Sequence, residues 1–166
     1  MRRIQIIVNN GAGTGSAVAV WKETKEYLQE NEISYNAYLT RYEKHAVKLA
    51  GQICGKIPEG PIYLLVVGGD GTINEVLNGI TDFDRVRLGV IPPGSGNDFA
   101  RNLGILRNTR EDLREITACI GQEQNGEKLQ RIDLGKVSWE GCEKPRIFGI
   151  SAGAGLDAIV CKKALH

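Results

Sequence analysis

Five residues at 68–72 have the types and the order of a turn that could bind an anion. The segment GGDGT directly follows an apolar run at 62–67 and opens a helical pattern. Glycines between a strand and a helix let backbone N–H groups approach an anion, and the helix start adds a favourable dipole. The Asp70 carboxylate would repel phosphate unless a metal ion or a lysine is shared between them. The structural alternative makes Asp70 a turn residue that tolerates left-handed geometry, with Thr72 and Glu75 as a capping box.

Two further glycine-rich loops follow strand-like runs. NNGAGTG at 9–15 comes after the run at 4–8, and PPGSGNDF at 92–99 comes after the run at 86–91. Clustered glycines allow backbone conformations that other residues cannot reach. Each loop also has a simpler explanation: the first could be a flexible connector, and in the second Asn97 and Asp98 could cap the next helix.

The three loops are expected to lie at one edge of one sheet. In an open α/β sheet, ligands collect beyond the carboxyl ends of the strands. Three glycine-rich loops at that edge favour a nucleotide site more than any one of them alone. The segment 68–72 is neither a P-loop nor a Gly-x-Gly-x-x-Gly dinucleotide motif.

The elements that must position these loops follow from hydrophobic periodicity. We expect strands at 4–8, 34–40, 62–67 and 86–91, and helices at 16–29, 43–55, 72–80, 97–103 and 109–120. Capping-box spacings are Thr40 with Glu43 and Thr109 with Asp112. This order predicts an α/β fold, a mostly parallel sheet with helices on both faces.

The alternation of predicted strands and helices stops near the end of the chain. Residues 121–128 are polar and turn-like, and the segments 130–138 and 146–150 are strand-like with no helix between them. We therefore expect a nucleotide-binding α/β domain at 1–125, followed at 126–166 by the start of a β-rich, antiparallel domain.

Composition excludes several classes of protein. The chain has 166 residues, 21 Lys+Arg against 20 Asp+Glu, a net charge of +1 and 42% hydrophobic residues. These values are typical of a soluble globular protein and exclude a disordered tail or a nucleic-acid polycation. The 4 cysteines form no Cys-x-x-Cys pair, which argues against a zinc site. No apolar run approaches the ~20 residues that span a bilayer, and no signal peptide is recognisable, so we expect a cytoplasmic protein.

Several segments together resemble the diacylglycerol kinase catalytic-domain family, which includes bacterial lipid kinases and the sphingosine and ceramide kinases. They are NNGAG at 9–13, GGDGT at 68–72, INEVLNG at 73–79, PPGSGNDFAR at 92–101, RIDLGKV at 131–137 and AGAGLDAIV at 152–160. GGDGT alone is shared with NAD kinases and resembles a phosphofructokinase turn. Asn74-Glu75 and the later Gly-Asn-Asp-Phe favour the lipid branch.

The resemblance implies an ATP-dependent kinase that phosphorylates a lipid hydroxyl, of diacylglycerol or a related lipid. It also implies two domains with ATP in the cleft between them. The first is an α/β domain like those of NAD kinase and phosphofructokinase, and the second is β-rich. The nucleotide contacts it implies are Asn9, Asn10, Gly11, Ala12, Gly13, Thr40, Gly69, Asp70, Gly71, Thr72, Ile73, Asn74, Glu75 and Ser95. Asp70 would act catalytically with Mg²⁺ and the phosphates, and Asp133 would join the metal-linked carboxylates. Phosphoryl transfer depends mostly on positioning and charge neutralisation, which suits such loops.

The sequence departs from the family pattern at several positions. Asn10 and Thr14 stand where Pro and often Lys occur, so a cationic phosphate contact is missing or supplied elsewhere. Ser95 replaces Thr, and Ile150 stands where Asn is common. Family members are longer, and their general base lies in a later segment. We therefore expect this chain to be a truncated kinase that lacks the base, binds ATP and is inactive alone.

Two other functions are compatible with the same residues. One is NAD kinase-like phosphorylation of a soluble acceptor, and the other is a non-catalytic nucleotide-binding module. For the lipid kinase, the expected partners are ATP and a lipid reached by transient membrane-surface contact, without nucleic acid. Its location would be cytoplasmic and peripheral to the membrane, and the sequence leaves the oligomeric state open.

Overall fold

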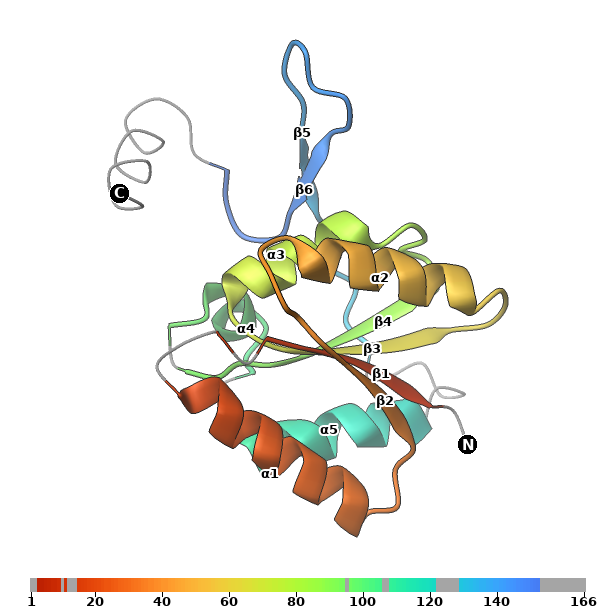
Figure 1. Cartoon of the computed structure of the whole chain (residues 1–166), viewed down its shortest axis with the longest axis vertical. Helices are drawn as coiled ribbons and strands as arrows, with labels where there is room; N and C mark the ends of the chain where they lie inside the picture. Colours follow the sequence, from red (N-terminus) through yellow and green to blue (C-terminus); the bar gives the residue numbers. More distant parts are fainter. Residues whose placement is uncertain are drawn as a thin grey trace.

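The structure is a computed structural model that describes residues 3–9, 11, 15–94, 96–105, 108–121 and 129–152. Its main body is a 4-stranded parallel sheet in the order β2-β1-β3-β4 with helices on both faces (Figure 1). The elements are β1 (Ile4–Val8), α1 (Ser16–Glu30), β2 (Tyr35–Leu39), α2 (His45–Lys56), β3 (Ile62–Val67), α3 (Asp70–Gly79), β4 (Val86–Ile91), α4 (Asp98–Asn102), α5 (Thr109–Gly121), β5 (Gly135–Val137) and β6 (Arg146–Phe148). The predicted α/β fold is confirmed.

Two hydrophobic layers hold the sheet between its helices. β1 and β3 are buried along their whole length, as the continuous apolar run at 62–67 predicts for β3. Alternate side chains enter opposite layers: Ile7, Leu64 and Val66 pack with α2 and α3, whereas Ile6 and Leu65 pack with α1 and α5. Figure 1 shows these two helix pairs on opposite faces of the sheet.

Helices α2 and α3 cross unusually closely at Gly79, the last residue of α3. A Cβ at this position would lie 2.2 Å from the carbonyl oxygen of Val47 and 2.8 Å from the Cβ of Ala50, both in α2. Only glycine allows this approach. Gly79 therefore sets the position of α3, the helix that begins at the GGDGT loop.

Beyond α5 the described chain forms an antiparallel hairpin, in which Gly135 pairs with Phe148 and Val137 with Arg146. The predicted antiparallel pairing is confirmed. Both strands are shorter than expected, because the chain is irregular before Gly135 and β6 ends at Phe148. Residues 122–128 lie outside the described residues, so the division at 125 and 126 stays a prediction. No described helix is both long and apolar enough to cross a membrane.

The predicted capping boxes at α2 and α5 are wrong. α2 begins at His45, after Lys44 in a left-handed conformation with φ 64°, so that Thr40 and Glu43 lie upstream of the helix start. At α5 the capping side chain is Asn108, whose Oδ1 accepts a hydrogen bond from the Glu111 N–H at 2.9 Å. This bond satisfies one of the free donors at the start of the helix.

Candidate functional site

The strand order places a topological switch point between β1 and β3, since the chain continues from β1 to one side of the sheet and from β3 to the other. Ligands of open α/β sheets bind beyond the carboxyl ends of strands at such a point. There the Asn9 N–H donates to the Val67 carbonyl at 2.9 Å, and the Gly68 N–H donates to the Ile91 carbonyl at 3.3 Å. Asn9 Nδ2 also donates to Thr72 Oγ1 at 2.8 Å. The described parts of the three loops thus converge as predicted.

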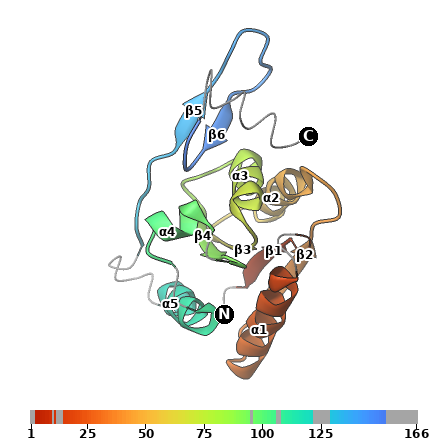
Figure 2. The same ribbon diagram turned by 90° about the vertical axis from the view of Figure 1, so that its left-hand side faces the viewer.

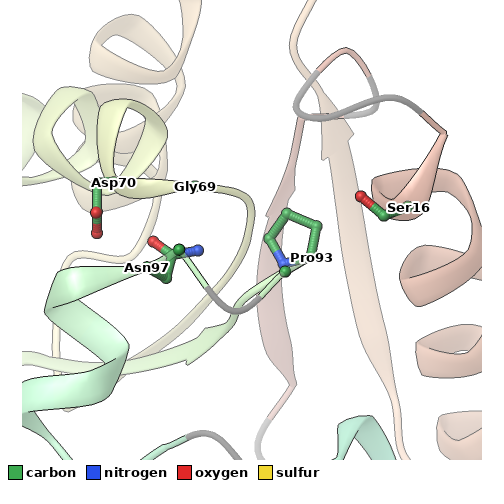
Figure 3. Close-up of a pocket in the computed structure, with 7 residues that line it drawn as sticks. Ser16, Gly69, Asp70, Pro93 and Asn97 are labelled. Carbon is green, nitrogen blue, oxygen red and sulfur yellow. The ribbon is translucent and has the colours of Figure 1, made fainter.

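A pocket of about 200 Å³ opens at this junction (Figure 3). Its lining comes from the start of α1, the GGDGT loop and the loop after β4, through Ser16, Gly69, Asp70, Pro93, Gly94, Gly96 and Asn97. Pockets for drug-sized ligands usually measure ~300–1,000 Å³. The pocket is therefore smaller than the usual site of a drug-sized ligand.

The glycines of this pocket are not required by the fold. A Cβ at Gly69, Gly94 or Gly96 would meet no described atom within 4 Å, and none of these residues has a left-handed φ. Gly68 differs, because a Cβ there would lie 2.9 Å from the side chain of Thr72. Unusual backbone angles are therefore not the reason for glycine at Gly69, Gly94 and Gly96, whereas Gly15 in the first loop does have a left-handed φ of 86°. The three lining glycines instead leave the backbone bare toward the pocket, which suits close approach by a ligand.

Two helix starts at the pocket favour an anion, whereas the Asp70 carboxylate in its lining opposes one unless a cation is shared. Ser16 and Asp70, which line the pocket, are the first residues of α1 and α3, and Gly15 before α1 has a left-handed φ of 86°. Within the described ranges, no side chain caps the start of either helix. Their first N–H groups and dipoles are thus available to a negatively charged group.

Asp70 holds the start of α4 instead of forming a left-handed turn. Its Oδ2 accepts a hydrogen bond from the Asp98 N–H at 2.9 Å, and its Oδ1 accepts one from the Phe99 N–H at 3.1 Å. In Figure 3 the side chain points from α3 toward Asn97, the residue before α4. The alternative that treats Asp70 as a left-handed turn residue is contradicted, since Asp70 is the first residue of α3.

The donor set is compatible with Mg²⁺ bound jointly with a ligand. Each oxygen of Asp70 accepts one hydrogen bond and keeps a lone pair, and Mg²⁺ is commonly held by one or two carboxylates together with substrate phosphates. In the described part of the chain, no group of three or more His, Cys, Asp or Glu side chains could hold a metal ion. Asp133 is exposed, and its predicted part in a carboxylate network is untested.

Glu75 caps a different helix from the one predicted. Its Oε1 accepts from the Lys44 N–H at 3.0 Å and its Oε2 from the Ala46 N–H at 3.2 Å, at the start of α2. The capping box with Thr72 is therefore wrong, and the Thr72 hydroxyl accepts from Asn9 instead. The two carboxylates of α3 each hold the start of a neighbouring helix.

The other predicted nucleotide contacts do not all lie at the pocket. Thr40 lies at the end of β2, where its N–H donates to the Val8 carbonyl at 2.9 Å. The N–H of Gly11 donates to Asn9 Oδ1 at 3.1 Å. Ile73, in α3, is buried in the core, and the Asn74 carbonyl accepts a hydrogen bond from Asn78 Nδ2. Gly71 is exposed in the first turn of α3. The predicted contacts Asn10, Ala12, Gly13 and Ser95 lie outside the described residues.

Sequence reasoning missed Ser16 and gave Asn97 only a capping role. Asn97 is 5% exposed and lines the pocket, and its Nδ2 donates to the Gly68 carbonyl at 3.5 Å. A signal was available in the sequence, because each residue immediately follows a glycine of a predicted loop.

Replacing Glu75 with alanine should destabilise the chain by about 1–2 kcal/mol, because two N–H groups at the start of α2 lose their acceptor. Urea-induced unfolding measures this change. The matched control is Glu43→Ala. Because the Glu43 side chain is exposed, this substitution should change the free energy of unfolding by less than ~0.5 kcal/mol. Equal stability of the two variants would contradict the cap.

The comparisons with known proteins agree with this geometry. Residues 3–137 match the family model described as "Diacylglycerol kinase catalytic domain". The chain is 31% identical over 163 residues to a Bacillus subtilis protein named "Putative lipid kinase YtlR", covering 96% of the chain and 50% of that relative. It is 37% identical over 143 residues to the diacylglycerol kinase of Bacillus subtilis, covering 83% of the chain and 43% of that relative.

A solved structure has the same fold. The crystal structure of a diacylglycerol kinase from Bacillus anthracis matches with a TM-score of 0.58 and 29% identity, over 70% of this chain and 39% of that one. The chain thus spans half or less of the length of these similar proteins.

Proposed function

The chain belongs to the diacylglycerol kinase catalytic-domain family, and on that premise we propose that it is the ATP-binding part of an enzyme that transfers the γ-phosphoryl group of ATP to a lipid hydroxyl. Diacylglycerol or a related lipid is the proposed acceptor. The observation that carries the proposal is the pocket at the switch point, whose bare glycines and two helix starts suit a chain of phosphates.

Each residue of the pocket would have a limited task. The backbone at Gly69, Gly94 and Gly96 would approach the phosphates, and the start of α1 at Ser16 would add its dipole. Asp70 would hold Mg²⁺ together with the phosphates, and the bound ion would neutralise charge on the transferring group. Asp70 is kept in place by the backbone of α4.

The acceptor side of the reaction is proposed to lie outside this chain. The chain covers 50% and 43% of two lipid kinase relatives, so the lipid contacts and the general base would belong to the remaining part. Residues 1–166 alone are proposed to bind Mg·ATP without turnover. Lipid contact at a membrane surface would then depend on the same missing part.

A lipid panel tests the proposal. The natural protein that carries this chain is incubated with radiolabelled Mg·ATP and vesicles containing diacylglycerol, sphingosine or ceramide, with NAD as the soluble alternative. A phosphorylated lipid supports the proposal. Labelled NADP, or ATP binding with no labelled product at all, would overturn it in favour of a soluble acceptor or a non-catalytic module.

Replacing Gly69 with alanine should weaken ATP binding by about tenfold or more, equivalent to ~1.4 kcal/mol, because the new methyl group would stand between the backbone and the phosphates. The fold should be as stable as before or gain up to ~1 kcal/mol, since no described atom lies within 4 Å of that methyl. Calorimetric titration with Mg·ATP and urea unfolding measure the two effects.

The control for this prediction is Gly55→Ala in α2, at an exposed position where a Cβ would also have open space. This variant should bind ATP as the wild type does. Unchanged ATP affinity in Gly69→Ala would mean that phosphates do not approach this loop.

A further inference from the structure

The side chain of Asn78, near the end of α3, forms two hydrogen bonds to the backbone of one residue in the hairpin. Its Nδ2 donates to the Ile147 carbonyl at 2.8 Å, and its Oδ1 accepts from the Ile147 N–H at 2.9 Å. This is the pairing that a neighbouring strand would offer to β6. Nδ2 also donates to the Asn74 carbonyl at 2.8 Å, which fixes the side chain against its own helix.

We infer that Asn78 is a positioning residue that docks the β5–β6 hairpin onto the helix beginning at the nucleotide loop. The inference rests on the proposed function, in which ATP lies beside the GGDGT loop and the acceptor side follows the hairpin. Figures 1 and 2, two views that differ by 90°, both show the hairpin lying beside α3.

A second contact makes the docking geometry specific. Gly149 follows β6 and lies so close to α4 that a Cβ there would be 2.7 Å from the Phe99 ring and 3.2 Å from Leu77. Phe99 is the residue whose N–H is held by Asp70. The hairpin therefore touches both α3 and α4, the two helices joined by the Asp70 carboxylate.

Apolar packing supports the same arrangement. Leu134 and Ile147 are partly buried against the core formed by α2, α3 and the sheet. Two apolar side chains alone would allow the hairpin to slide, whereas a paired donor and acceptor fix one register. Asparagine supplies both groups at the required length, and no residue of the same size offers the same pair of bonds.

The start of α3 lies at the pocket, and its end contacts the hairpin. Asp70 stands at the pocket, and Asn78 lies 8 residues further along the same helix, a rise of about 12 Å. Because a helix is stiff over this length, the hairpin is held at a fixed distance from the phosphates. A shift of ~1 Å in reacting groups can reduce a rate by about 100-fold, so loosening the hairpin should affect turnover more than ATP binding.

The test compares Asn78→Asp and Asn78→Leu in the natural protein that carries this chain. Aspartate keeps the size and the acceptor but loses the donor, and leucine loses both. The matched control is Asn31→Asp, because Asn31 Nδ2 makes the same bond to a carbonyl four residues earlier, Tyr27, without touching the hairpin. Hydrogen exchange of hairpin amides, ATP affinity and kcat for the lipid are measured on each variant, with urea unfolding as a check on the fold.

We expect at least tenfold faster exchange of the Ile147 amide in Asn78→Leu, ATP affinity within threefold of wild type, and kcat at least tenfold lower at unchanged KM for ATP. Asn78→Asp should loosen the hairpin at least as much as leucine, because a carboxylate oxygen would face the Ile147 and Asn74 carbonyls that now accept from Nδ2. The control should match wild type. Unchanged hairpin exchange, or faster exchange with unchanged kcat, would overturn the inference. If the wild type phosphorylates no lipid, the proposed function fails, and the exchange data still decide whether Asn78 docks the hairpin.

Discussion

Replacing Asp70 with asparagine is expected to lower phosphoryl transfer by the natural protein by about 100- to 1,000-fold, the usual cost of removing one electrostatic contact to a transition state. Asparagine has the same shape but no charge, so it would hold Mg²⁺ poorly beside the phosphates. Its amide group would also present a donor to an N–H of Asp98 or Phe99, both of which now donate to the carboxylate.

The two roles of Asp70 can be separated. Loss of the cap alone should lower the free energy of unfolding by about 1–2 kcal/mol, which leaves most of the protein folded. Loss of the metal contact should in addition raise the Mg²⁺ concentration needed for half-maximal rate. Kinetics over a Mg²⁺ series and urea unfolding therefore measure different consequences of the same substitution.

A matched control for Asp70→Asn is Asp84→Asn, since the Asp84 side chain is exposed and lies before β4, at the opposite end of the sheet. This variant should keep the wild-type rate and Mg²⁺ requirement. If Asp70→Asn retained the wild-type rate at every Mg²⁺ concentration, the metal assignment would be wrong. A lower rate with an unchanged Mg²⁺ requirement would leave Asp70 with the capping role alone.

The strands could be predicted from the sequence because their signal is local. β1, β3 and β4 have the predicted bounds, because each is a mostly apolar run that ends at a loop rich in glycine, proline or asparagine. Only β3 is apolar and buried at every position. The convergence of the glycine loops followed from the same reasoning, because parallel strands bring their carboxyl ends to one edge.

The helix caps could not be predicted, because their partners are distant in the sequence. Asp70 caps α4 across 28 residues, and Glu75 caps α2 across 31. A capping-box pattern considers only residues three apart, so it assigned Glu75 to its own helix. The contact of Asn78 with Ile147 spans 69 residues and has no local signature at all.

The structural reason for each glycine could not be predicted from the sequence either. Gly69 and Gly79 flank one helix and look alike in the sequence, yet a Cβ at the first would meet open space and a Cβ at the second would overlap α2. Only tertiary contacts show that packing requires glycine at Gly79 and not at Gly69, for which we propose a ligand contact. The two substitutions should therefore fail in opposite ways, one in binding and the other in stability.

Replacing Gly79 with alanine should destabilise the chain by about 1–3 kcal/mol or more, the range for overpacked sites. The new Cβ would lie 2.2 Å from the Val47 carbonyl oxygen and 2.8 Å from the Ala50 Cβ. Neither contact can be relieved by turning a flexible side chain, so α2 and α3 must separate. Since α3 carries both Asp70 and Asn78, the separation should weaken ATP binding as well.

Two other glycines of the same helix pair provide the controls. Gly55→Ala has open space and should gain up to ~1 kcal/mol from helix propensity, while Gly51→Ala would meet the Gly79 carbonyl at an ordinary 3.4 Å and should change stability little. Urea midpoints should therefore rank Gly55→Ala first and Gly79→Ala last. A Gly79→Ala variant as stable as Gly51→Ala would mean that α2 and α3 pack less closely than their backbones indicate, and the fixed placement of α3 beneath the hairpin would lose its physical basis.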